Sequence, residues 1–140
     1  MKKIKVFIDG GARGNPGPAA CGVVVYDENG KIIKKVGELL GSETNNQAEY
    51  HGLIAGLILV KDLGAENVEI FSDSELLVKQ MRGEYKVKDA HLKPLALVAR
   101  FLIKTFKRVT FFAIPREKNK AADKLVNSTL DGKKPQKPLF

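Results

Sequence analysis

Apolar and polar residues alternate at the start of the chain. Within residues 4–8 every second position is apolar, and the intervening Phe7 is apolar as well. This pattern predicts a β-strand with two mostly apolar faces, which is typical of the middle of a sheet. The strand ends on a carboxylate, Asp9, where two glycines allow a sharp turn or a close neighbour.

The next segments predict an antiparallel meander. Residues 21–26 and 31–40 have strand composition, and the Asp-Glu-Asn-Gly sequence at 27–30 is suited to a tight hairpin. The glycine-rich segment 14–18 is expected to be a wide hairpin loop. It lacks the Gly-Lys-Ser/Thr sequence of a phosphate-binding loop.

A helix is predicted at residues 44–62, because Thr44 or Asn45 can cap it. Its apolar stripe, extended four residues towards the N-terminus, includes Glu49. A carboxylate on a buried stripe is costly unless it meets a cation. The alternative is a glutamate near solvent at the helix end, stabilised by the helix dipole.

A second apolar strand, at residues 67–73, also ends on an aspartate, Asp73, and a short helix is predicted at 75–81. The order strand, helix, strand implies a crossover connection between parallel strands. Asp9 and Asp73 can therefore lie at one edge of the sheet. The alternative is that Asp73 only caps the short helix.

The remaining elements are helices at 92–104 and 121–130 and a strand at 109–114, with a basic loop before the last helix. Asp123 lies in the first turn of that helix, on its apolar stripe. The pattern predicts an α/β fold with a mixed sheet, an antiparallel meander followed by parallel strands, flanked by helices.

Length and composition are consistent with one globular domain at residues 1–130 and a flexible basic tail at 131–140. The chain has 140 residues, 44% of them hydrophobic, and a single cysteine, Cys21. We expect a soluble, cytoplasmic, monomeric protein without an internal disulfide or a membrane segment.

Charge is unevenly distributed along the chain, whose net charge is +8. Residues 1–85 hold 10 Lys and Arg against 12 Asp and Glu, whereas residues 86–140 hold 14 against 4. This asymmetry indicates a polyanion, such as a nucleic acid, as a partner. A solvated lysine surface is the alternative interpretation.

Four carboxylates at strand ends and helix starts would form a dense negative cluster that needs cations. Oxygen ligands favour Mg²⁺ or Mn²⁺ over Zn²⁺. Two such ions are the usual apparatus for in-line attack on a phosphodiester, so the residues predict a metal-dependent reaction of that class.

Four motifs resemble those of type 1 ribonuclease H in order and spacing. They are FIDGGARGNPGP at 7–18, TNNQAEY at 44–50, SDS at 72–74 and NKAAD at 119–123. The resemblance implies a five-stranded ribonuclease H-like fold and cleavage of the RNA strand of RNA–DNA hybrids, leaving 5′-phosphate and 3′-hydroxyl ends. It also implies two Mg²⁺ ions, with Mn²⁺ as an alternative, held by the catalytic set Asp9, Glu49, Asp73 and Asp123.

The same resemblance assigns substrate contacts. Glu49 would also accept from the 2′-hydroxyl that distinguishes RNA from DNA. The RNA side of the minor groove would be lined by Asn15, Asn46 and Ser74, whereas Thr44 and Asn45 would hold a phosphate of the DNA strand. The amides of Asn45 and Asn46 can equally cap the helix. The predicted set also includes Gly10, Gly11, Arg116 and Asn119.

The chain departs from the family pattern in three places. The loop before Asp123 has no histidine, the short segment 83–91 has no room for a tryptophan-rich basic insertion, and Ser42 stands where many members have an arginine. We expect affinity for the nucleic acid to come from Arg116, Lys118 and Lys120 and from the helical segment 92–107.

Two further hypotheses stay open. Gln136, Leu139 and Phe140 resemble a short sliding-clamp-binding peptide, but Lys137 and Pro138 fit that pattern poorly and a frayed tail explains the segment better. A hybrid-specific enzyme has two alternatives: a non-catalytic module that binds RNA or the hybrid on the same fold, and a nuclease that acts on double-stranded RNA or RNA–DNA junctions.

Overall fold

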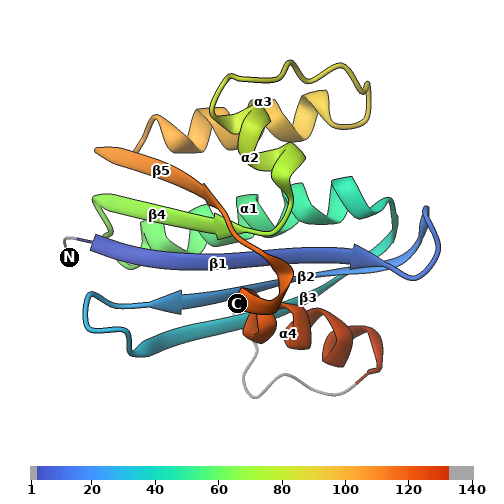
Figure 1. Cartoon of the computed structure of the whole chain (residues 1–140), viewed down its shortest axis with the longest axis horizontal. Helices are drawn as coiled ribbons and strands as arrows, with labels where there is room; N and C mark the ends of the chain where they lie inside the picture. Colours follow the sequence, from blue (N-terminus) through green and yellow to red (C-terminus); the bar gives the residue numbers. More distant parts are fainter. Residues whose placement is uncertain (1–2, 133–140) are drawn as a thin grey trace.

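The computed structural model describes residues 3–132, which form a five-stranded sheet with helices on both faces (Figure 1). The strands are β1 (Lys3–Ala12), β2 (Gly17–Tyr26), β3 (Ile32–Glu43), β4 (Asn67–Ser72) and β5 (Arg108–Ala113). The helices are α1 (Asn45–Asp62), α2 (Glu75–Met81), α3 (Lys93–Ile103) and α4 (Lys120–Leu130), with a short 3-10 turn, η1 (Arg116–Lys118), before α4.

The strands lie in the order β3-β2-β1-β4-β5. β1, β2 and β3 form an antiparallel meander, whereas β4 runs parallel to β1 and β5 runs parallel to β4. Parallel neighbours require a crossover, which α1 provides before β4 and which α2 and α3 provide before β5. The predicted fold class, a mixed sheet that begins as a meander, is confirmed.

Three strands extend further than the sequence pattern predicts. β1 does not end at Asp9 but continues to Ala12, because Gly10, Gly11 and Ala12 still pair with β2. β2 begins at Gly17 and β3 continues to Glu43, and these two residues pair with each other across a register shift near Ala19. Small residues at this end of β2 give a weak strand signal. Pairing across the irregularity nevertheless satisfies their backbone hydrogen bonds. From Thr44 onward, the predicted element boundaries agree with the structure within one residue.

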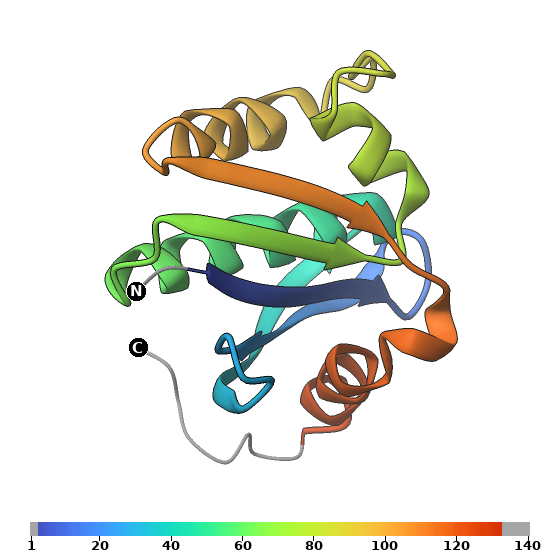
Figure 2. The ribbon, with the colours of Figure 1, turned by 60° about the vertical axis from the view of Figure 1, so that its left-hand side comes forward.

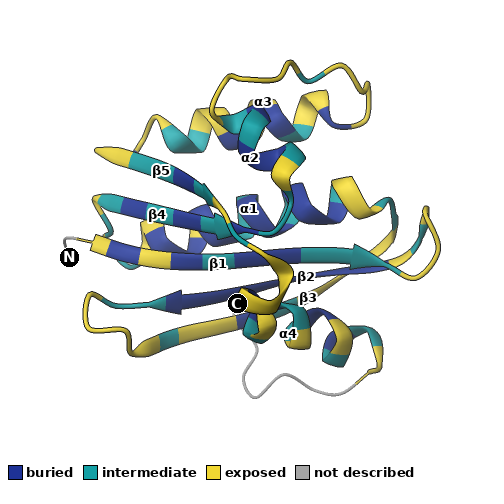
Figure 3. Cartoon of the chain, viewed as in Figure 1, coloured by how far each residue is buried: buried dark blue, intermediate teal, exposed yellow. Residues whose placement is uncertain are grey.

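The core lies between the sheet and α1, and α3 packs beside α1 and contributes to the same core. α4 packs on the opposite face over β2, β3 and β1 (Figure 2). Residues 23–25 of β2 are all fully buried, because α1 covers one face of this strand and α4 the other. Figure 3 shows this burial concentrated in the central strands and the inner faces of the helices.

No helix in the described part of the chain is both long enough and apolar enough to span a membrane. Residues 1, 2 and 133–140 lie outside the description. The predicted tail, with its Gln136, Leu139 and Phe140, therefore stays a prediction.

Candidate active site

Three carboxylates lie close together where β1 and β4 stop pairing. β1 pairs with β4 only as far as Ile8 and Ser72, while its pairing with β2 continues to Ala12. Asp9 and Asp73 directly follow this last pair, so they lie side by side where the strands β1 and β4 separate. Oxygen atoms of Asp9, Glu49 and Asp73 lie within 4.8 Å of one another. This confirms the predicted shared edge of the sheet.

The close approach of α1 to β1 places Glu49 in this group. A Cβ atom built on Gly10 would lie 2.2 Å from the backbone carbon of Ala48, and one on Gly52 would lie 2.9 Å from the carbonyl oxygen of Asp9. Only residues without a side chain permit this distance between helix and strand. Glycine on both elements therefore brings the second turn of α1, which carries Glu49, against the end of β1.

Burial and mutual repulsion raise the pKa of all three carboxyl groups. Desolvation, followed by the charge of Asp73, raises the pKa of Asp9 to about 7. Desolvation, followed by the charge of Asp9, raises the pKa of Glu49 well above its ordinary value, and desolvation also raises that of Asp73. The nearby backbone N–H of Gly10 opposes the rise in pKa of both Asp9 and Glu49. Ionising all three groups together is therefore unfavourable unless a cation neutralises them.

The donor set fits a hard divalent cation. Asp9 and Glu49 are only 6% and 8% exposed, and Oε1 of Glu49 is buried without a hydrogen-bond partner in the described structure. A buried carboxylate oxygen without a donor is unfavourable unless it ligates a metal. Oxygen-only ligands of this kind suit Mg²⁺ or Mn²⁺.

Asp123, the fourth predicted carboxylate, lies in the same pocket but not in the tight group. It projects from the first turn of α4, and its Oδ1 is 3.7 Å from Nη2 of Arg116. Its charge contributes to the raised pKa of Asp9 and of Asp73, so it faces the cluster. The structure therefore groups Asp9, Glu49 and Asp73 tightly and places Asp123 near Asp9, outside that group.

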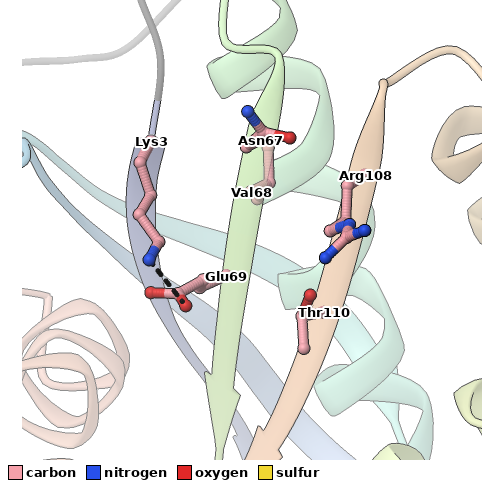
Figure 4. Close-up of a pocket in the computed structure, with 6 residues that line it drawn as sticks. All are labelled: Lys3, Asn67, Val68, Glu69, Arg108 and Thr110. Carbon is pink, nitrogen blue, oxygen red and sulfur yellow. Dashed lines mark ion pairs between the residues drawn. The ribbon is translucent and has the colours of Figure 1, made fainter.

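An open pocket of about 420 Å³ surrounds the carboxylates. Its walls are the end of β1, the start of α1 and the exposed side of α4, with Arg13 and Arg116 among the lining residues. A second pocket, of about 360 Å³, lies near the opposite end of the sheet, where Lys3 forms an ion pair with Glu69 at 3.5 Å (Figure 4). That pocket has no carboxylate cluster and carries no chemistry that the sequence predicts.

Thr44 and Asn45, which are predicted to contact a phosphate of the DNA strand, lie at the N-terminus of α1. There they cap the helix and hold the loop between β1 and β2. Oγ of Thr44 accepts from the backbone N–H of Gln47 at 3.1 Å, and Gln47 Oε1 accepts from the N–H of Thr44 at 2.8 Å. Oδ1 of Asn45 accepts from the N–H of Ala12 at 2.8 Å, and Oδ1 of Asn15 accepts from the N–H of Asn45 at 2.9 Å. These contacts fix the loop after β1 against the N-terminus of α1.

Other predicted substrate residues differ in their exposure. Asn46 is exposed at the start of α1, and the side chain of Arg116 is 80% exposed. Oγ of Ser74 accepts from the N–H of Leu77 at 3.2 Å, so Ser74, and not Asp73, caps α2. Gly11, unlike Gly10, has room beside it, with Val126 as the nearest side chain.

Asn119 is buried, with an exposed fraction of 1%. Its Nδ2 donates to the carbonyl of Ile8 at 2.9 Å and lies 3.5 Å from Oδ2 of Asp73. The side chain therefore lies behind the carboxylates, linking β1 to the loop before α4. We expect it to position Asp73, because direct contact with a substrate would require the loop to move.

The departures noted in the sequence have structural counterparts. The connection between α2 and α3 is short, so the basic insertion has no equivalent among the described residues. The loop before Asp123 forms η1, whose residues are Arg116, Glu117 and Lys118, without a histidine. Sequence reasoning missed Arg13, which lines the pocket. The signal was a basic residue in the glycine-rich loop directly after the first aspartate.

Comparison with known proteins places the chain in a family. The family model described as reverse transcriptase-like matches residues 7–129. The chain is 42% identical over 130 residues to the bifunctional protein Rv2228c of Mycobacterium tuberculosis, covering 92% of this chain and 36% of that protein. It thus spans about a third of that relative's length.

Two solved structures are similar over nearly their whole length. RNase H1 from the halophilic archaeon Halobacterium salinarum is 39% identical, with a TM-score of 0.90, covering 93% of this chain and 98% of that one. LC11-RNase H1, solved in complex with an RNA/DNA hybrid, is 42% identical, with a TM-score of 0.88, covering 92% and 97%. Together with the carboxylate geometry, these matches show that the chain belongs to the ribonuclease H family, in its type 1 group, within the reverse transcriptase-like domains.

Proposed function

We propose that this chain is a metal-dependent endoribonuclease that hydrolyses the RNA strand of RNA–DNA hybrids and leaves 5′-phosphate and 3′-hydroxyl ends. The observation that carries the proposal is the buried group of Asp9, Glu49 and Asp73, with the unpaired Oε1 of Glu49. A similar protein, LC11-RNase H1, is known in complex with an RNA/DNA hybrid, which supports the choice of substrate.

The carboxylates of this site would hold two Mg²⁺ or Mn²⁺ ions. When bound, these ions activate the attacking water and stabilise the leaving oxygen. The raised pKa of Asp9, about 7, means that protons and cations compete for the same oxygens. Metal binding therefore displaces protons from the cluster, and metal affinity should rise with pH.

The chain's own residues position the substrate around this group. Glu49, at the N-terminal turns of α1, would accept from the 2′-hydroxyl beside the scissile phosphate, which is the group that distinguishes RNA from DNA. The exposed amide of Asn46 and the anchored amide of Asn15 lie at the same end of α1 and suit hydrogen bonds in a minor groove. The N-terminus of α1 also favours a phosphate, because its dipole is positive there.

The site is better suited to cleavage than to binding alone. A protein that only bound nucleic acid would have four carboxylates repelling its ligand, without a use for them. The pocket is open to solvent, so a duplex can approach the carboxylates directly. The cytoplasmic location expected from the sequence is part of the same proposal.

End-labelled RNA–DNA hybrid, RNA–RNA and DNA–DNA duplexes, incubated with Mg²⁺, Mn²⁺ or EDTA, test the proposal. We expect cleavage of the RNA strand of the hybrid only, in either metal but not in EDTA, and no cleavage by Asp9→Asn. Tight binding of the hybrid without cleavage in either metal would indicate a binding module. Equal cleavage of double-stranded RNA would refute the assignment of substrate.

A further inference from the structure

Arg13 lines the carboxylate pocket at the end opposite to Arg116. Its guanidinium forms an ion pair with Asp131, with Nη1 2.7 Å from Oδ1, and its Nη2 donates to the carbonyl of Asn127 at 3.5 Å. The Arg13 and Asp131 side chains are 48% and 44% exposed. Nucleic-acid backbone that crosses the pocket towards this end would therefore meet an accessible guanidinium.

The backbone that carries Arg13 is held in place. The N–H of Arg13 donates to the carbonyl of Pro18 at 2.8 Å, closing the loop, and the preceding Ala12 donates to Oδ1 of Asn45. The loop is thus tied to the N-terminus of α1, the helix that carries Glu49. Because the anchor point is fixed relative to the carboxylates, only the side chain of Arg13 has to reorient to reach a ligand.

The charges around the pocket follow a pattern. Arg13 and Arg116 are the cationic side chains among the described lining residues, and each is paired with an acidic residue of α4 or its C-terminal cap, Asp131 and Asp123 respectively. Exposed ion pairs contribute little net stability. A phosphate accepts two hydrogen bonds from a guanidinium fork and can replace such a partner readily.

We propose that Arg13 binds a backbone phosphate of the strand that is cleaved, next to the scissile phosphate, and that Asp131 holds the guanidinium in place until the nucleic acid displaces it. The inference rests on the proposed function. It adds a phosphate contact on the loop side of the carboxylates to the contacts that the motifs predict.

Two substitutions that break the same ion pair test this role. Arg13→Ala should raise the KM for the hybrid about tenfold, with little change in kcat. It should also reduce the slope of log KM against log salt concentration by about one, the value for one lost phosphate contact. Arg13→Lys should restore part of the affinity. Asp131→Asn should instead lower KM about two- to fivefold, because Arg13 is then free to bind phosphate.

A purely structural ion pair predicts a different result. In that case Arg13→Ala and Asp131→Asn would change the melting temperature alike and would leave KM unchanged or shift it in the same direction. Either outcome would overturn the proposal. The double variant separates the proposed competition from general repulsion: the effect of Asp131→Asn should largely disappear in the Arg13→Ala background. An effect of full size there would refute the competition.

The outcome for wild type separates this inference from the proposed function. If wild type cleaves the hybrid and the single variants match it in KM, only the role of Arg13 fails. If wild type binds the hybrid without cleaving it, fluorescence anisotropy with the same oligonucleotide replaces KM, and the same opposite shifts are expected in Kd. If wild type neither binds nor cleaves, both proposals are refuted. Should Arg13→Ala not fold, Arg13→Lys and Asp131→Asn still decide.

Discussion

Asp9→Asn should stabilise the metal-free protein at neutral and alkaline pH while it abolishes cleavage. The pKa of Asp9 is raised from 3.8 to about 7, chiefly by burial and then by the charge of Asp73. A group whose pKa is higher in the folded than in the unfolded state contributes stability that is present below the unfolded pKa. That contribution is lost as the pH rises through the folded pKa. Asparagine cannot ionise and avoids the loss.

The size of the effect follows from the shift. Each pKa unit corresponds to about 1.4 kcal/mol, so a rise of roughly three units costs the wild-type protein up to about 4 kcal/mol at pH 8. Between pH 5 and pH 7 the contribution of Asp9 falls by about 2–3 kcal/mol. Removing the Asp9 charge also relieves Glu49, whose pKa it helps to raise.

The assay is urea unfolding in EDTA at pH 5 and pH 8. Between pH 5 and pH 8 the free energy of unfolding should fall by about 2–3 kcal/mol more for wild type than for Asp9→Asn. Asp62→Asn, an exposed carboxylate at the end of α1, is the matched control and should follow wild type. Adding Mg²⁺ at pH 8 should then stabilise wild type but not Asp9→Asn, because the metal binds only the folded site. If wild type and Asp9→Asn lose the same stability between the two pH values, the account of a strained carboxylate cluster is wrong.

Three further perturbations have expected outcomes. Gly10→Ala should destabilise the fold by about 1–3 kcal/mol or more, since the new methyl group would overlap the backbone of Ala48. Gly11→Ala, whose methyl group would meet only ordinary contacts, should change the unfolding midpoint little. Asn119→Ala should lower the free energy of unfolding by about 1–3 kcal/mol, because it leaves the carbonyl of Ile8 without its side-chain donor. The same variant should lower kcat more than it changes KM, and an unchanged kcat would argue against a positioning role. Hybrid binding by the inactive Asp9→Asn protein should weaken steeply between 50 and 200 mM salt, and a flat salt profile would contradict the predicted phosphate contacts.

Much of this protein could be predicted from its sequence, because the relevant signals are local. Alternation and helical periodicity depend on neighbours in the chain, so the elements after Thr44 were predicted within one residue. Two apolar strands that each reach an aspartate, Asp9 and Asp73, together with one crossover helix, were enough to place both carboxylates at one edge of the sheet, although β1 continues past Asp9 to Ala12. Glu49 was predicted by extending an apolar helical stripe onto a charged residue.

Tertiary structure decided the features that depend on distant contacts. Only packing shows that Gly10 and Gly52 let α1 approach β1 closely enough for Glu49 to join the cluster. The sequence indicated room for a close neighbour at Gly10, but not that α1 is this neighbour, and it gave no signal for Gly52. The burial of Asn119 and the position of Asp123 near Asp9, outside the tight group, depend on how the loop before α4 packs against β1. Likewise, the pairing of Arg13 with a residue more than a hundred positions away could not be read from the chain, because long-range ion pairs leave no periodic pattern in a single sequence.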